Sequence, residues 1–177
     1  MIEKIQPVVG AYSARPIEFR PYDPRSAEIA QRVVSQLAFH APKLRLEHVG
    51  STAVSLCAGS GTIDLLAATA AAELADLEGQ LTQLGFEPIS TADSFFAEAK
   101  LFGGSIAQDD QTWTLHVCLV AADHAIIDSL RFLRSCLRSD PDLRKAYVEQ
   151  KRTSLAKGAD SAQYARAKSE FLKMILG

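Results

Sequence analysis

The chain has 177 residues, of which 47% are hydrophobic and 23% are charged. This length can bury one good core but not two, so we expect a single domain over residues 1–177. The 19 basic and 21 acidic residues give a net charge of −2, which provides no general attraction for double-stranded nucleic acid or for an anionic membrane. Any ligand site must therefore be local, and the composition leaves the oligomeric state open.

The cysteines and the hydropathy pattern indicate a cytoplasmic protein. Cys57, Cys118 and Cys136 are odd in number, widely spaced and set among apolar neighbours, which favours reduced thiols over a disulfide framework or a zinc site. The N-terminus shows no apolar core of a signal peptide, and no apolar run approaches the ~20 residues of a membrane span. We therefore expect a cytoplasmic location without membrane association.

Hydrophobic periodicity predicts the elements of the first two thirds of the chain. Helical spacing of apolar residues predicts helices over Ser26–Phe39 and Ala70–Leu84, the second ending at Gly85. Alternation and apolar runs predict five strands: Arg45–Val49, Thr62–Ala67, Phe86–Ile89, Phe95–Leu101 and Trp113–Val120. We place the hairpin loop between the last two strands at Gly103-Gly104 and at the acidic run Gln108–Gln111.

From Asp123 onward the apolar period is helical. Ile126 to Leu137 form one apolar helical face, Asp140-Pro141 is a typical N-cap and first-turn pair, and Asp160-Ser161 opens a last helix. We therefore expect an α/β (α+β) fold, with a mixed sheet backed by helices over about residues 1–121 and an all-helical C-terminal segment of three helices over about residues 122–177.

The run Glu47–Val54 has the pattern of a phosphate-binding turn. A strand-like approach ends at Gly50, which lets backbone N–H groups come close to a phosphate, and Ser51 and Thr52 offer hydroxyl groups. His48 precedes the turn and is a candidate for the same site. Such triplets also serve as ordinary turns and helix N-caps, so both interpretations stay open.

Asp64 and His116 are candidate catalytic residues and metal ligands. Asp64 lies inside an apolar run, where a carboxylate needs a pairing partner, hydrogen bonds or a metal ion. His116 points away from the face of its two strand neighbours, and a neutral imidazole can bind a metal or act as a base. A hydrogen-bonded structural histidine is the alternative. We predict that Gly50, Ser51, Asp64 and His116 converge on one cleft.

Basic residues of the C-terminal helices are candidate phosphate contacts. Arg131, Arg134 and Arg138 share one helical face, and guanidinium groups match phosphate oxygens. Lys168 lies in the last helix. We predict that Arg134 or Lys168 faces the cleft, although such rows also occur as ordinary solvated faces.

The motif at Gly50 and several later stretches resemble the GrpB family, small proteins assigned to the polymerase-β-like nucleotidyltransferase fold. The later and flanking stretches follow in the same order: Arg20–Pro24, Leu115–Val117, Leu137–Pro141, Tyr147 to Lys151 and Tyr164 to Phe171. The resemblance implies a nucleotidyltransferase-like sheet, a nucleoside triphosphate as substrate or ligand, and a divalent metal, Mg²⁺ or Mn²⁺. It implies metal ligation and catalysis at Asp64 and His116, and phosphate or nucleotide contacts from Gly50, Ser51, Thr52, His48, Arg134 and Lys168.

The chain departs from the pattern of that family at three places. The Pro-Gly-Leu stretch and the Lys-Pro pair that usually follow the Gly-Ser turn are replaced by Ser55–Gly61, Thr114 stands where a histidine is usual, and Ser135 where an aspartate is usual. Two-metal transfer needs more ligands than Asp64 with His116. Two functions remain: metal-dependent nucleotidyl transfer to an unknown acceptor or, alternatively, catalytically degenerate binding of a nucleotide or other phosphate ligand. The first predicts a small-molecule nucleotide as the partner, and the second also allows another phosphorylated small molecule or a protein partner. A metal-dependent phosphohydrolase is a third interpretation.

Overall fold

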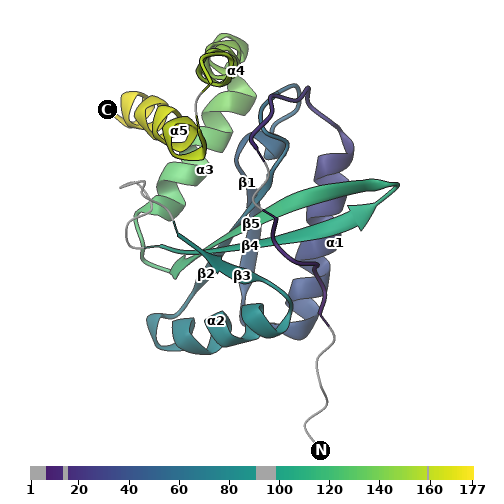
Figure 1. The fold of residues 1–177 in the computed structure, drawn as a ribbon. Helices are drawn as coiled ribbons and strands as arrows, with labels where there is room; N and C mark the ends of the chain where they lie inside the picture. Colours follow the sequence, from purple (N-terminus) through teal and green to yellow (C-terminus); the bar gives the residue numbers. More distant parts are fainter. Residues whose placement is uncertain (1–6, 14–15, 91–98, 159) are drawn as a thin grey trace, which may run out of the picture.

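Five strands form one mixed sheet through the middle of the molecule (Figure 1). The computed structural model describes residues 7–13, 16–90, 99–158 and 160–177. Within them the strands are β1 (Arg45–Val49), β2 (Ile63–Thr69), β3 (Glu87–Ile89), β4 (Lys100–Gln108) and β5 (Gln111–Ala121). Their order in the sheet is β1-β2-β5-β4-β3, with β2 and β5 parallel and the other neighbours antiparallel. The predicted mixed sheet is confirmed.

Helices cover both faces of this sheet (Figure 1). In the described residues they are α1 (Arg25–His40), α2 (Leu74–Gln83), α3 (Ile126–Ser139), α4 (Pro141–Ala156) and α5 (Ser161–Leu176), with short 3₁₀ turns η1 (Ser51–Ala53) and η2 (Ala71–Glu73). The all-helical C-terminal segment is therefore as expected. None of the described helices is long and apolar enough to cross a membrane.

Strand alternation divides the core between the two faces. Ile63 and Leu65 pack with residues of α1 and α2 in one cluster, whereas Leu66 packs with Ile127 and Leu130 of α3 in another. Because successive side chains of a strand point to opposite faces, Asp64 lies on the α3 face with Leu66. The C-terminal helices thus cover the face that carries the candidate carboxylate.

The hairpin turn between β4 and β5 lies in the predicted acidic run Gln108–Gln111 and not at Gly103-Gly104. Of the expected strand Phe95–Leu101, residues 95–98 lie outside the described residues, and β4 runs through Gly103-Gly104 instead of turning there. The turn is made by Asp109-Asp110, both in the left-handed region with φ of 51° and 59°, which suits a two-residue hairpin. The glycines stand inside the strand because the rings of Tyr12 and Phe86 occupy the space their side chains would need.

The predicted helix ends agree with the structure. The helix after β2 begins with η2, continues as α2 and ends before Gly85, whose φ of 103° only glycine adopts readily. The Asp140 side chain accepts hydrogen bonds from two backbone amides at the start of α4, and Asp160 forms a reciprocal capping box with Gln163 at the start of α5. Local capping chemistry therefore places the last two helices.

Candidate functional site

The parallel pair β2 and β5 brings Asp64 and His116 together. They are register partners, so both side chains point to the same face. Asp64 Oδ1 lies 3.7 Å from His116 Nδ1, and the side chains are 25% and 35% exposed, respectively. Burial lowers the pKa of His116, while the neighbouring Asp64 carboxylate acts in the opposite direction. The imidazole is therefore mostly neutral at pH 7, and its buried Nε2 has no hydrogen-bond partner in the described part of the chain.

Gly50 brings the turn after β1 against this pair. Its backbone has φ 72° and ψ −170°, a conformation that favours glycine. A side chain at Gly50 would also collide with the Asp64 carboxylate. The turn and the carboxylate, separate in sequence, are thus in direct contact because the first residue of the turn has no side chain.

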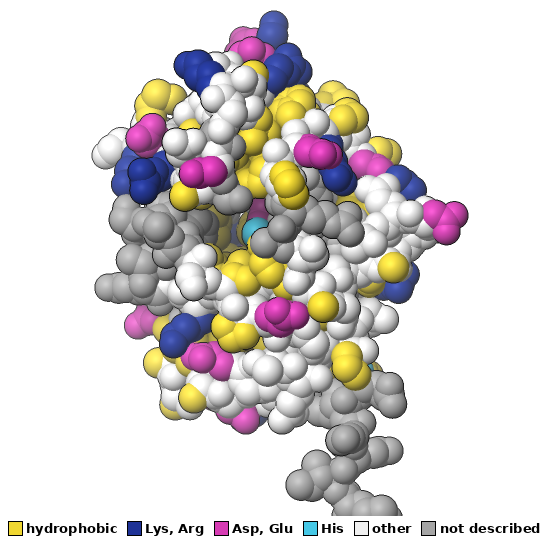
Figure 2. Space-filling model, in the orientation of Figure 1, with side chains coloured by type: hydrophobic (Ala, Val, Ile, Leu, Met, Phe, Trp, Pro, Cys, Tyr) yellow, Lys and Arg dark blue, Asp and Glu magenta, His cyan; other side chains and the backbone are white. Residues whose placement is uncertain are grey.

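Gly50, Asp64 and His116 line one cavity of about 940 Å³. Its wall also includes Tyr12 of the N-terminal segment and Lys168 of α5. Figure 2 shows a hollow on this side of the molecule in which a histidine and a carboxylate are visible among hydrophobic side chains. The predicted convergence is confirmed for these three residues and for Lys168.

Ser51, the fourth residue of that prediction, lies behind the cavity wall. It is 6% exposed, and a Cβ at Gly59 would lie 3.1 Å from Ser51 Oγ and 2.8 Å from Lys151 Nζ. Lys151 is itself 2% exposed and donates a hydrogen bond of 2.5 Å to the carbonyl of Ala58. Burial lowers the pKa of Lys151 to about 8. Sequence reasoning noted Lys151 only within the family resemblance and missed this position behind the turn.

His48 and Thr52 brace the turn. Thr52 Oγ1 donates its proton to the carbonyl of Thr62 at 3.1 Å and lies 2.9 Å from His48 Nε2. Because the hydroxyl proton is used in this way, the hydroxyl oxygen accepts from His48, whose imidazole carries its proton on Nε2. His48 pairs with Leu65, on the face opposite Asp64. Burial lowers the pKa of His48 to about 4. The expectation that His48 faces the cleft as a phosphate contact is corrected: it is a neutral support. Thr52 lines the cavity, but its hydroxyl is engaged in this bracing.

Arg134, like His48, makes contacts within the fold and does not line the cavity. It donates to the carbonyl of His48 at 2.7 Å and to Glu47 Oε2 at 3.1 Å. Arg131 contacts the same carboxylate, and Arg138 donates to the carbonyl of Ala53 at 2.8 Å. The three arginines do face the turn, but their guanidinium groups are bonded to Glu47 and to backbone carbonyl oxygens. We therefore correct the expectation that Arg134 looks into the cleft.

Glu47, Arg131 and Arg134 form a cluster, the Glu47 cluster. We expect Glu47→Gln to be measurably less stable than the wild type. Hydrogen bonds from Arg131, and then from Arg134, lower the pKa of Glu47 against the opposing effect of burial. This carboxylate therefore stabilises the fold above its unfolded pKa, and the contribution is lost as the pH falls through the lower folded pKa. Urea unfolding at pH 7 should show a loss of about 1–2 kcal/mol.

The matched control is Glu18→Gln. Glu18 lies 3.5 Å from Arg20 in a pair in which its side chain is 71% exposed, and such exposed pairs contribute little. The two variants should differ clearly at pH 7 and converge in strong acid. Equal effects at pH 7 would show that the Glu47 cluster does not clamp α3 to β1.

Comparison with known proteins identifies the family. A family model described as "GrpB protein" matches residues 16–177. The chain belongs to the GrpB family. The crystal structure of conserved protein GrpB from Enterococcus faecalis is similar to this GrpB-family chain with a TM-score of 0.67 and 20% identity, covering 90% of this chain and 100% of that one. No curated protein matches the chain.

The same GrpB-family chain is similar to crystal structures of the Cid1 poly(U) polymerase. One structure bound to MgATP has a TM-score of 0.57 and 14% identity, covering 84% of this chain and 50% of that one. Another, bound to MgGTP, has a TM-score of 0.53 and 14% identity over the same shares of the two chains. The chain thus spans about half the length of Cid1, and the shared part shows a nucleotidyltransferase-like fold.

The candidate metal ligands of this GrpB-family chain are few. In the described residues no group of three or more His, Cys, Asp and Glu side chains is placed to hold a metal ion. Cys118 lines the cavity, but burial, together with the charge of Asp64, raises the pKa of its thiol to about 12. It therefore stays protonated near neutral pH and does not add a thiolate. Among the described residues, Asp64 and His116 are the candidate pair, with Asp64 Oδ1 3.7 Å from His116 Nδ1.

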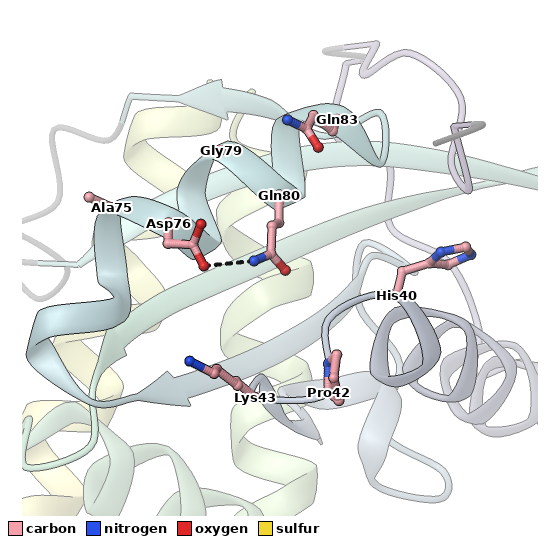
Figure 3. A pocket seen from close by; sticks show the side chains of 8 residues that line it. All are labelled: His40, Pro42, Lys43, Ala75, Asp76, Gly79, Gln80 and Gln83. Atoms are coloured by element: carbon pink, nitrogen blue, oxygen red, sulfur yellow. Dashed lines mark hydrogen bonds between the residues drawn. The ribbon is translucent and has the colours of Figure 1, made fainter. Parts of the chain in front are cut away.

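A second cavity, of about 610 Å³, lies between the end of α1 and α2 and shares no lining residue with the first. Figure 3 shows its polar side chains, with Asp76 bonded to Gln80. Lys43 in its wall pairs with Glu73 at 2.9 Å. Since these charged groups are satisfied by near neighbours, the cavity beside Asp64 is the better candidate for a ligand site.

Proposed function

We propose that this GrpB-family protein binds a nucleotide or another phosphorylated small molecule in the cavity beside Asp64. The observation that carries the proposal is the meeting of Gly50, Lys168 and the Asp64–His116 pair in one cavity of about 940 Å³. Small-molecule sites usually have volumes of about 300–1,000 Å³ and a few convergent polar groups. Free nucleotides of the cytoplasm, the compartment predicted from the sequence, are the first ligands to test.

The turn and two lysines favour an anionic ligand. Gly50 precedes η1 with a φ of 72°, and the absence of a side chain there lets an anion approach the backbone closely. Lys168 adds a cation from α5. Lys151 lies behind the turn with its ammonium group fixed on the carbonyl of Ala58. The positive charges of the two lysines would offset the negative charge of a bound phosphate, in a cavity that already contains the Asp64 carboxylate.

Asp64 and His116 are the residues we propose to hold a divalent cation, Mg²⁺ or Mn²⁺. The Asp64 carboxylate suits a single ion that keeps water ligands and also binds phosphate oxygens of the ligand, and the imidazole of His116 would add a nitrogen ligand, which is less usual for such an ion. The two residues do not suit a two-metal site, which needs carboxylates enough to clamp two ions. When bound, a single ion would supply charge neutralisation for the phosphates.

Metal-dependent nucleotidyl transfer to an unknown acceptor is the second candidate. The fold shared with the Cid1 poly(U) polymerase and the pairing of Asp64 with His116 favour it. Release of pyrophosphate from labelled nucleoside triphosphates, measured with Mg²⁺ or Mn²⁺ across a panel of acceptors, tests it against Asp64→Asn. Equal background rates in the two proteins would leave binding without transfer as the function.

Binding itself is tested with Lys168→Met. We expect ATP or another nucleoside triphosphate to bind the wild type, followed by titration calorimetry or by the fluorescence of Trp113, the single tryptophan and a cavity residue. Loss of a charge-assisted contact should weaken binding about ten-fold or more. Lys173→Met, at an exposed position of the same helix, should change it less than about two-fold. Equal affinities of the two variants would exclude Lys168 as a phosphate contact.

A further inference from the structure

The N-terminal segment places an aromatic ring in the cavity that no sequence motif indicated. Gly10 forms a bridge with Ser105 of β4, and Ser105 Oγ donates to the carbonyl of Ala11 at 2.8 Å. One residue further, the amide of Tyr12 donates to Glu87 Oε1 of β3 at 3.1 Å. These contacts, separated by more than seventy positions in sequence, fix Tyr12 at the edge of the cavity that it lines.

The Tyr12 ring lies flat on the sheet beside the candidate site. Gly103 and His116 are register partners on β4 and β5, and the ring occupies the space of the absent Gly103 side chain, with Cε2 only 2.8 Å from where a Cβ would stand. The ring centroid is 5.7 Å from that of His116, at an interplanar angle of 54°. One ring face is therefore covered by the strand. The half-buried residue presents the rest to the cavity.

The cavity has a side with cationic side chains and a side without them. Lys168 comes from α5, and Arg20 from the segment before α1. The described lining residues that belong to β3, β4 and β5 include no lysine or arginine, and among them are Pro88, Ile89, Leu101 and Cys118. Phosphate groups belong on the side with the cationic side chains. The side that Tyr12 covers suits a flat, uncharged group, for which an aromatic face is the usual platform.

We infer that Tyr12 is a specificity-determining residue on which the planar base of the bound ligand stacks. The inference rests on the proposed function and narrows it, because it selects nucleotides over phosphorylated sugars or inorganic polyphosphates. The other three tyrosines that line the cavity are less suited to this role. Tyr22 belongs to the segment before α1 that also carries Arg20. Tyr147 is buried against Phe171, with ring centroids 4.9 Å apart, and Tyr164 is buried in α5.

The test compares ATP with tripolyphosphate on the full chain, by titration calorimetry with and without Mg²⁺. Tyr12→Leu keeps an apolar side chain over Gly103 but removes the aromatic face. We expect it to weaken ATP binding about ten-fold or more and to leave tripolyphosphate binding within two-fold. Tyr12→Phe should bind ATP with the affinity of the wild type, since phenylalanine keeps the aromatic ring on which the base stacks. Thermal unfolding of each variant verifies that the fold is kept.

The outcomes separate this inference from the proposal on which it rests. Selective loss of ATP binding in Tyr12→Leu, with recovery in Tyr12→Phe, supports stacking. If Tyr12→Leu weakens both ligands equally, or neither, stacking is overturned while phosphate binding stands. If the wild type binds neither ATP nor tripolyphosphate, the proposed function fails, and the inference falls with it.

Discussion

Gly50→Ala is expected to lower the free energy of unfolding by about 2–4 kcal/mol and to abolish binding of a phosphate ligand. Two costs add. The backbone at Gly50 has a φ of 72°, where an alanine is strained, and the new Cβ would collide with the Asp64 carboxylate. Since η1 and Asp64 meet at this glycine, either the turn or the carboxylate must move. Urea unfolding measures the first effect, and calorimetric titration with ATP the second.

Gly79→Ala is the matched control, and its effect should have the opposite sign. Gly79 lies in the interior of α2, is exposed, and a Cβ there would meet nothing within 4 Å. Alanine is favoured over glycine in a helix by about 1 kcal/mol, so this variant should be more stable than the wild type and bind equally. Similar changes in both variants would show that contact between the turn and Asp64 does not govern the site.

The faces on which Asp64 and His116 lie could be predicted, because alternation along a strand is a short-range rule. Their meeting also needs the pairing of β2 with β5, two strands far apart in sequence, and that arrangement was expected only from the resemblance to the GrpB family. The helix starts at Asp140 and Asp160 were predictable for a similar reason, since an N-cap acts within three residues.

The remaining parts of the site depend on contacts between segments far apart in sequence. Gly103 looks like a loop residue by composition, but it lies in β4 because Tyr12 packs on it. Arg134 has the spacing of a phosphate contact, but Glu47, on a strand far earlier in the chain, takes its guanidinium group. The residue type indicates which interactions a side chain can make, whereas the tertiary packing determines which partner it actually bonds to.

The two sides of the turn carry different kinds of charge. On the cavity side, Asp64 and Lys168 belong to the proposed ligand site. Behind the turn, Lys151 is enclosed by Ala58, Cys57 and the ring of Tyr147, with Nζ 4.3 Å from the ring centroid. A buried ammonium group usually costs stability unless its hydrogen bonds repay the loss of water. This cost makes Lys151 the best place to measure how strongly the fold constrains a charge next to the turn.

The stability of the wild type should rise with pH relative to Lys151→Met. Burial lowers the pKa of Lys151 in the folded state from 10.5 to about 8, against the weaker raising effect of Cys57. Between these values the unfolded chain binds the proton and the folded chain does not, so stability increases with pH. It is fully present above pH 10.5 and is lost as the pH falls through 8. The difference in unfolding free energy between the two proteins should therefore change by about 2 kcal/mol between pH 7.5 and pH 10.

Lys145→Met provides the comparison, because Lys145 is an exposed residue of the same helix α4. Its stability difference from the wild type should stay constant within about 0.5 kcal/mol over the same pH range. Measuring a pH-dependent difference, instead of a single stability, separates the ionisation of Lys151 from the packing and hydrogen bonds that methionine also changes. A flat difference for Lys151→Met would mean that the fold stabilises the ammonium form of Lys151 as well as water does in the unfolded chain. In that case the ionisation of Lys151 would not affect the stability of the fold.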